Sequence, residues 1–316
     1  MPLLETRNVI VEYRAGRQRP IRAVDGVSIR IEPGESLGLV GESGSGKTTL
    51  GHAALGLLRP ASGAILFDGR DINSMRGAEA KQFRRRAQMV FQDPVGSLNP
   101  RMSVGSMLKE PLLIHRLCGR RAREEKAKAL LEQVGLGPEC LSRYPHEFSG
   151  GQRQRIGIAR ALALAPELLV ADEPVSALDV SVQAQVMNLL RELRARMGLA
   201  LLFIAHDLAV VRYLCSRVAV MFRGRIVESG PAQVLFEAPA HPYTRSLLES
   251  APDVDRALAG RERGAGLPPA RAPAEAADWT GCAFHPRCPL ARPECLARAP
   301  ELASIGPGRE CACRAV

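Results

Sequence analysis

The sequence predicts an α/β fold, and three observations lead to this prediction. Short apolar runs alternate with amphipathic helical stretches from Leu3 to about Ser250. Ser36–Val40 is an apolar run that passes through a glycine-rich turn into a helical stretch beginning at Lys47. Leu168–Ala171 and Leu199–Ala205 are further apolar runs, each followed by polar residues. Ligands gather at the carboxyl ends of strands in open parallel sheets, so these ends predict the functional site.

The composition is that of a globular protein. The chain has 316 residues, 46% of them hydrophobic and 24% charged, which is enough for one large domain and a smaller one. No apolar run approaches the length of a membrane-spanning helix, and the N-terminus lacks the pattern of a signal peptide, so we expect a cytosolic chain.

The net charge of +10 raises the question of nucleic acid or an anionic membrane as a partner. An aromatic content of only 4% argues against base-stacking surfaces, and we predict no nucleic-acid partner. The basic cluster Arg84–Arg86 is expected on a solvated helix face, with lipid headgroups or an acidic partner as the alternative.

Composition also predicts the domain organisation. We expect a large domain over residues 1–252, with a helical subdomain at about 96–162. Residues 253–278 are rich in Ala, Pro, Gly and Arg and have little to bury, so they are expected to form a linker. Residues 279–316 form a small region that holds five of the eight cysteines.

The segment Gly41–Thr48 fits the pattern G-x-x-x-x-G-K-S/T between a predicted strand and a predicted helix. Glycines let backbone N–H groups curl around an anion, and a helix N-terminus adds the positive end of its dipole. We predict that Lys47 reaches the β- and γ-phosphates of a nucleotide and that the Thr48 hydroxyl binds Mg²⁺. The residues predicted to contact the nucleotide here are Gly41, Ser43, Gly44, Gly46, Lys47, Thr48 and Thr49.

Two carboxylates, Asp172 and Glu173, follow the apolar run Leu168–Ala171. Paired acids after a strand can simply begin a helix, but with a phosphate loop upstream they predict catalysis. Asp172 is expected to bind Mg²⁺, directly or through water, and Glu173 to orient and deprotonate the attacking water.

Ser149, Gly150, Gly151 and Gln152 precede another helical stretch. A serine followed by glycines is first of all a helix N-cap that allows close packing. The same arrangement presents N–H donors and a hydroxyl to a γ-phosphate, although a helical insert would separate it from the chain's own phosphate loop.

These motifs, in this order, resemble the nucleotide-binding subunit of an ATP-binding cassette (ABC) transporter over residues 3 to about 250. The resemblance implies a P-loop NTPase cassette with a mixed sheet core, an antiparallel β subdomain and a helical subdomain. It implies an ATPase that uses ATP and Mg²⁺. It also implies head-to-tail dimerisation, so that Ser149, Gly151 and Gln152 act on ATP bound to the partner.

Further roles come from the same resemblance. Gln92 would touch Mg²⁺ and couple to the membrane subunits, and Asp179 would belong to the D-loop at the dimer interface. His206 would be the switch histidine that contacts the γ-phosphate. Tyr13 would stack on adenine, with plain packing at a strand end as the alternative. The catalytic set implied is Glu173, His206 and Gln92.

Three segments are similar to the oligopeptide/dipeptide permease branch of importers, namely Phe91–Arg101, Tyr144–Gln152 and Glu173–Gln183. The residues Gln152 and Pro174–Ser176 resemble those of the second of the two ATPase paralogues in this branch. The resemblance therefore implies import of di- or oligopeptides, with a related importer of nickel chelates or glutathione, or a soluble non-transport ABC ATPase, as alternatives.

The same resemblance implies the partners and the location. The partners would be a paralogous ATPase subunit, two transmembrane permease subunits and an extracytoplasmic substrate-binding protein, with homodimerisation as the alternative to the paralogous pair. The chain would then be peripheral, at the cytoplasmic face of the inner or plasma membrane.

The cysteines Cys282, Cys288, Cys295 and Cys313 do not have C-x-x-C spacing, so generic zinc and ferredoxin patterns do not apply. The run Gly281–Cys288 is similar to a run in the tail of the permease branch, where four such cysteines can hold a 4Fe–4S cluster. The alternatives to a cluster are a zinc site, a disulfide and a packed tail without metal. Cys311 makes the identity of the fourth ligand ambiguous.

Overall fold

The structure is a computed structural model that describes residues 1–14, 20–250 and 281–315. The described residues divide into two compact units, each assembled from several segments of the chain. The first unit comprises Met1–Glu5, Arg30–Glu35 and Leu66–Phe203, and the second comprises Thr6–Ile29, Ser36–Ile65 and Ile204–Val316. The predicted linker at 253–278 lies outside the described residues.

The first unit contains a parallel part of a sheet, with the strand order β9-β8-β7. Strand β7 (Ala87–Val90) pairs in parallel with β8 (Leu168–Asp172), from Ala87 opposite Leu168 to Val90 opposite Ala171. Every residue of β8 and of β9 (Ala200–Ala205) is buried, and all of them except Asp172 are apolar, as is typical of strands in a parallel sheet. The structure confirms both predicted strands, β8 with one more residue and β9 with one fewer.

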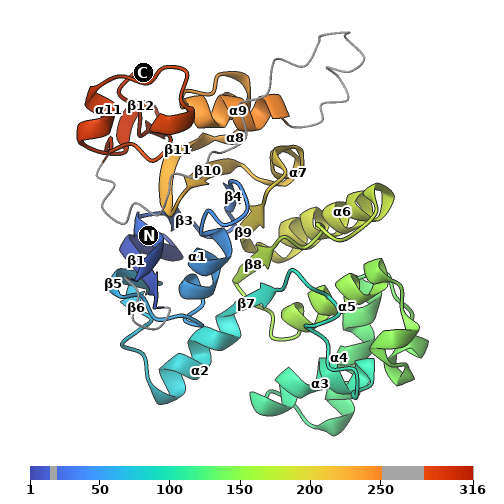
Figure 1. Ribbon diagram of the computed structural model, residues 1–316. Helices are drawn as coiled ribbons and strands as arrows, with labels where there is room; N and C mark the ends of the chain where they lie inside the picture. The colour runs from blue at the N-terminus through green and yellow to red at the C-terminus, as the bar shows by residue number, and fades with distance from the viewer. Residues whose placement is uncertain (15–19, 251–280, 316) are drawn as a thin grey trace. The chain divides into compact units, whose positions relative to one another are not determined.

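Helices make up most of the rest of the first unit, and in Figure 1 α3, α4 and α5 form a separate group within it. Local sequence explains several helix ends. Ser103 caps α3 by accepting a hydrogen bond from the N–H of Ser106, and Gly198 ends α6 in the left-handed conformation. The helices are α2 (Gly77–Arg86), α3 (Val104–Ile114), α4 (Arg120–Gln133), η1 (Pro138–Ser142), η2 (Pro145–Glu147), α5 (Gly150–Leu162) and α6 (Val180–Met197).

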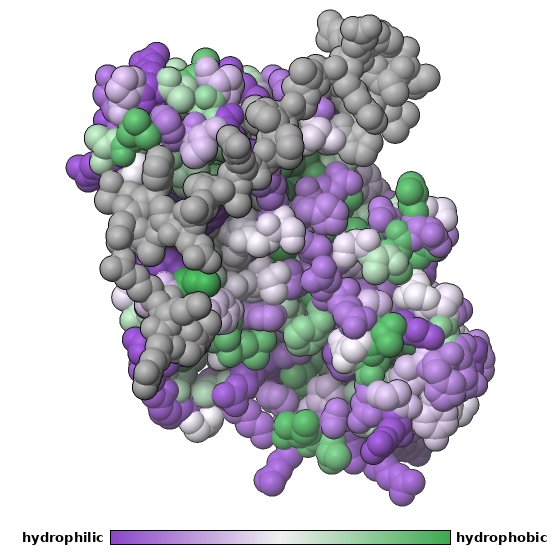
Figure 2. Space-filling view, viewed as in Figure 1, coloured by the Kyte–Doolittle hydropathy of each residue, from purple (hydrophilic) through white to green (hydrophobic). Residues whose placement is uncertain are grey.

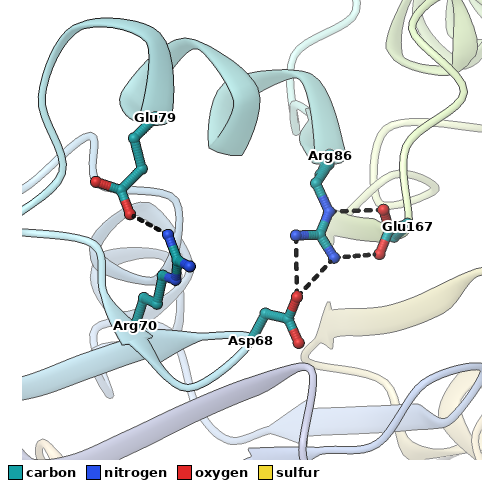
Figure 3. Close-up of polar contacts among 5 residues, drawn as sticks. All are labelled: Asp68, Arg70, Glu79, Arg86 and Glu167. Carbon is teal, nitrogen blue, oxygen red and sulfur yellow. Dashed lines mark hydrogen bonds and ion pairs between the residues drawn. The ribbon is translucent and has the colours of Figure 1, made fainter.

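Arg86, the last residue of α2, connects the start of β7 to the start of β8 through its side-chain contacts (Figure 3). The Arg86 guanidinium donates to both carboxylate oxygens of Glu167, at 2.6 and 2.7 Å, and to Asp68 at 3.1 Å. It also lies 4.8 Å from the centre of the Phe67 ring. The prediction of a solvated face holds for Arg84 and Arg85, which are exposed, but it is wrong for Arg86.

The second unit contains a mixed part of a sheet, with the strand order β12-β13-β11-β10-β4. Strand β4 (Ser36–Val40) is entirely buried and confirms the predicted strand at its predicted bounds. It pairs in parallel with β10 (Arg217–Phe222), which pairs antiparallel with β11 (Arg225–Pro231). The last strands, β12 (Ala303–Gly306) and β13 (Arg309–Cys311), extend this order antiparallel beyond β11.

Strands of a smaller antiparallel sheet complete the β structure. In the second unit β2 (Ile21–Val27) pairs antiparallel with β1, from Val27 opposite Val9 to Ile21 opposite Tyr13. The other members are β1 (Leu4–Tyr13), β3 (Arg30–Ile31), β5 (Ser62–Phe67) and β6 (Arg70–Asp71). Strands β1, β5 and β9 contribute residues to both units.

An aromatic cluster anchors the C-terminal residues to the second unit. Phe284 lies 5.5 Å from Phe222 and 5.5 Å from Tyr243, measured between ring centres, and all three rings are buried. The helices of this unit are α1 (Lys47–Ala54), α7 (Leu208–Leu214), α8 (Ala232–Glu237), α9 (Pro242–Ser250), η3 (His285–Arg287) and α11 (Glu294–Ala297).

Among the described residues, no helix has the length and apolar character needed to cross a membrane. On the described part of the face shown in Figure 2, apolar residues (green) are scattered among polar ones (purple).

Replacing Arg86 by Ala is expected to destabilise the first unit by about 1–2 kcal/mol, because two paired carboxylates lose a bidentate partner. Arg70→Ala is the matched control, since Arg70 makes a single ion pair with Glu79 at 3.0 Å and is 74% exposed (Figure 3). We expect it to cost less than about 0.5 kcal/mol. The midpoint of thermal unfolding measures the stability of both variants. Equal decreases in the two midpoints would contradict the role given to Arg86.

Candidate functional site

The phosphate loop lies in the second unit between β4 and α1, as predicted. Two of its glycines, Gly41 and Gly46, are required because other backbone segments pass close to them. A Cβ atom on Gly41 would lie 2.1 Å from the carbonyl oxygen of Met221, and one on Gly46 would lie 2.0 Å from that of Ala23. Gly46 also has a φ of 102°, which favours glycine. A side chain at either position would therefore collide with the neighbouring backbone and displace the loop.

Lys47 is folded over this loop. Its Nζ donates to the carbonyl oxygens of Gly41, at 2.8 Å, and Glu42, at 2.9 Å, and the residue is 5% exposed. Gly46 has no side chain with which to cap α1, so the first N–H groups of the helix are suited to an anion. The loop thus fits a phosphate chain, with Lys47 as its cation.

Other predicted nucleotide contacts of the second unit surround the start of α1. Ser43 and Gly44 are exposed, and Thr48 and Thr49 are partly buried. The Tyr13 hydroxyl lies 3.3 Å from the Thr49 hydroxyl, and Tyr13 is 46% exposed at the end of β1. The structure therefore brings Tyr13 to the phosphate-loop helix and leaves much of its ring exposed.

His206 is also in the second unit. It is exposed and follows β9 directly. The next residue, Asp207, caps α7 by accepting a hydrogen bond from the N–H of Ala209 at 2.8 Å. His206 therefore lies directly after a buried strand, as the sequence predicts.

The paired carboxylates lie in the first unit at the end of β8. Asp172 is the last residue of the strand and is 3% exposed. The Gln92 side-chain amide donates to a Glu173 carboxylate oxygen at 3.0 Å. Glu173 has a φ of 42°, which costs a non-glycine residue about 1–3 kcal/mol and commonly marks functional sites. The structure therefore brings Gln92 and Glu173, which are 81 residues apart, into contact.

The turn after Glu173 is held by contacts that the sequence analysis did not identify. The Glu173 carbonyl oxygen accepts from the Ser176 hydroxyl at 3.0 Å. The Gln183 side-chain amide donates to the carbonyl oxygens of Val175, at 3.0 Å, and Leu178, at 2.9 Å. Gln183 is the fourth residue of α6, and its segment indicates only a family resemblance, so these contacts of its side chain are visible only in the folded chain.

Ser149 caps α5, as predicted, in a reciprocal capping box with Gln152. The Ser149 hydroxyl accepts from the Gln152 N–H at 3.3 Å, and the Gln152 side chain accepts from the Ser149 N–H at 3.1 Å. A Cβ atom on Gly151 would lie 2.4 Å from the Val182 side chain, so this glycine permits close packing of α5 on α6. Asp179 is exposed and immediately precedes α6.

Four cysteines line one pocket of the second unit, namely Cys282, Cys288, Cys295 and Cys313. Burial raises the pKa of the Cys282 and Cys288 thiols. Cys311 does not line this pocket; it is buried on β13 opposite Glu228, and burial raises its pKa to about 12. Cys313 is therefore the fourth member of the set.

Among the described residues, no three or more His, Cys, Asp or Glu side chains are grouped so that they could hold a metal ion. The same residues form no disulfide. The four cysteines nevertheless line the same pocket.

Two known families match parts of this chain. The family described as ABC transporter matches residues 24–176, and the family described as oligopeptide/dipeptide transporter, C-terminal region, matches residues 227–295. The oligopeptide transport ATP-binding protein AppF of Bacillus subtilis is 50% identical over 294 residues, covering 93% of this chain and 89% of that protein.

Solved structures with the same fold are ATP-binding cassettes. The cassette MJ0796, in a dimeric post-hydrolysis state bound to ADP and Pi, superposes with a TM-score of 0.66 at 29% identity. That alignment covers 72% of this chain and 98% of MJ0796. CbiO1 of Clostridium perfringens, part of the ABC transporter complex CbiONQ, gives a TM-score of 0.66 at 28% identity. It covers 75% of this chain and 91% of CbiO1.

Replacing Gly46 by Ala is expected to weaken ATP binding by at least about tenfold, because the new methyl group collides with the Ala23 carbonyl and displaces the loop. Gly198→Ala is the matched control: Gly198 has a φ of 64° but nothing within 4 Å of its added Cβ atom. It should lower the melting temperature and leave ATP affinity unchanged. Titration with a fluorescent ATP analogue measures both, and unchanged affinity in the Gly46 variant would contradict the assignment.

Proposed function

The chain belongs to the ABC transporter family, and we propose that it hydrolyses ATP to power the import of di- or oligopeptides through separate membrane permease subunits. The observation that carries the proposal is the match of residues 227–295 to the C-terminal region of oligopeptide/dipeptide transporters. The 50% identity to the oligopeptide transport protein AppF supports the same cargo class. Importers of nickel chelates or glutathione are the nearest alternatives.

In the proposed nucleotide site, residues of the second unit bind the phosphates. Lys47 would bind the β- and γ-phosphates, and backbone N–H groups of the loop other than that of Glu42 would donate to their oxygens. The support is the position of the Lys47 amine over the loop and the uncapped start of α1. Tyr13 would stack on adenine, and His206 would contact the γ-phosphate.

The first unit is proposed to supply the base and ligands for Mg²⁺. Glu173 would accept a proton from the attacking water, and the Gln92 amide would hold the carboxylate until the site is complete. Asp172 and Gln92 would be ligands of Mg²⁺, which supplies charge neutralisation on the phosphates. The 3.0 Å bond from Gln92 and the strained backbone of Glu173 support this assignment.

A second cassette is proposed to complete each site. In the single chain the Ser149 hydroxyl and the Gln152 side chain cap α5, which fixes the helix start that would face the partner's ATP. Gly151 and Asp179 would lie at the same dimer interface. The residues Gln152 and Pro174–Ser176 favour a paralogous ATPase subunit as the partner, and two permease subunits and a substrate-binding protein would complete the transporter. The chain would then lie at the cytoplasmic face of the membrane.

The four-cysteine pocket is proposed to hold a 4Fe–4S cluster. Four thiols around one pocket are the donor set that such a cluster takes. Because each thiolate of this group binds a different iron, the sulfur atoms need not converge on one point, as they would around a single zinc ion. The cluster would join Cys282, Cys288 and Cys295 to Cys313 at the end of the described chain.

Replacing Glu173 by Gln is expected to lower ATP turnover by at least about a hundredfold while ATP still binds, because the base is lost and the shape is kept. Glu192→Gln, at an exposed position of α6, is the matched control and should turn over ATP at the normal rate. Phosphate release and ATP binding measure the two effects in the purified chain.

The same pair of variants tests the cargo. Cells that lack this chain should regain uptake of labelled peptides when given the wild type or Glu192→Gln, but not Glu173→Gln. Normal turnover in the Glu173 variant would reject Glu173 as the base. Restored turnover without peptide uptake would reject peptide import.

Anaerobic purification is expected to give coloured protein with a broad absorption band at about 400 nm and about four irons per chain. Cys288→Ser should lose the colour and the iron, whereas Cys118→Ser, outside the pocket, should keep both. Colourless protein with zinc, or with no metal, would reject the cluster and leave the ATPase proposal intact.

A further inference from the structure

Glu42, the second residue of the phosphate loop, is held by three partners from different parts of the second unit. Its carboxylate accepts from both terminal nitrogens of Arg287, at 3.0 and 2.9 Å. Its N–H donates to the Tyr243 hydroxyl at 2.8 Å, and its carbonyl oxygen accepts from Lys47 at 2.9 Å. Both peptide groups flanking this residue and its side chain are therefore fixed in one arrangement.

Arg287 is itself held in place. It is the last residue of η3, between Cys282 and Cys288 of the four-cysteine pocket. The turn before it contains Phe284, whose buried ring packs on Phe222 and Tyr243. The Arg287 side chain is 16% exposed, so this ion pair is screened less than a surface pair.

The pair also changes the electrostatics of the loop. The Glu42 side chain is 41% exposed, and a carboxylate in a loop shaped for an anion repels the phosphates that the loop binds. The Arg287 guanidinium neutralises this charge and holds it by a bidentate contact. The Glu42 N–H donates to the Tyr243 hydroxyl, and Lys47 holds the adjoining carbonyl oxygen.

We propose that Arg287 is a positioning residue of the nucleotide site: the C-terminal cysteine-rich region holds the phosphate loop in its binding conformation through the Arg287–Glu42 pair. Arg287 touches no phosphate and acts through Glu42. The inference rests on the proposal that the loop binds ATP. It links residues 245 positions apart, so a change in the C-terminal turn alters nucleotide affinity at the loop.

The test compares Arg287→Ala with Arg298→Ala in the full chain. Arg298 also belongs to the C-terminal region, but it pairs with Glu301 on the surface and contacts no part of the loop. Arg287→Ala should raise the Kd and KM for Mg-ATP about tenfold and keep kcat within about twofold, because the loop loses its preorganisation but the base is intact. Arg298→Ala should match the wild type.

Charge reversal separates positioning from folding. Glu42→Arg and Arg287→Glu should each weaken ATP binding, and the double variant should recover most of the affinity because the ion pair is restored with its signs exchanged. Arg287→Lys should be intermediate, since lysine keeps the charge and loses the bidentate contact. If Arg287→Ala fails to fold, the charge-reversed pair still gives the answer in a folded chain.

Three outcomes are decisive. A rise in KM with rescue by the double variant supports the proposal. A folded Arg287→Ala chain that binds ATP as tightly as the wild type, or a double variant no better than either single variant, overturns it while the proposed ATPase stands. A wild-type chain that binds no ATP overturns both.

Discussion

The second unit is organised around a loop whose backbone has almost no freedom. Gly41 and Gly46 pass within van der Waals contact of the carbonyl oxygens of Met221 and Ala23, so the loop cannot move outward into β10 or β2. Lys47 closes the loop from within by hydrogen bonds to its carbonyl groups. A phosphate site made of N–H donors works only if those donors are already oriented, because reorienting them on binding costs free energy. The packing of β4, β10 and α1 supplies that orientation.

The first unit shows a different kind of constraint, which is strain held by local hydrogen bonds. Glu173 leaves the buried β8 in an unfavourable backbone conformation, and contacts from Ser176 and Gln92 fix both its backbone and its carboxylate. Gln183 then holds the following turn. A carboxylate kept in one place by its surroundings suits a base that must meet a water molecule in one orientation.

Local signals explain why much of the fold could be predicted. Strand β4, the start of α1 and the Ser149 cap depend on residues within a few positions of each other, so pattern and capping rules place them. The contacts of Arg86 cannot be predicted in this way, because a basic run at a helix end is typical of a solvated face and its carboxylate partners lie 18 and 81 residues away. The Glu42–Arg287 pair spans 245 residues and belongs to no motif, so only the folded chain reveals it. Cys311 is buried on β13, whereas Cys313 follows that strand and lines the pocket, and spacing alone does not distinguish the two.

The proposed nucleotide site puts ATP in the loop from Gly41 to Thr48. The most direct measurement is backbone hydrogen exchange of the wild-type chain during a titration with Mg-ATP. Peptides covering residues 41–54 should exchange more slowly as ATP binds, with a half-effect at the Kd measured by calorimetry. Unchanged exchange in these peptides, while calorimetry reports bound ATP, would place the nucleotide elsewhere and contradict the account.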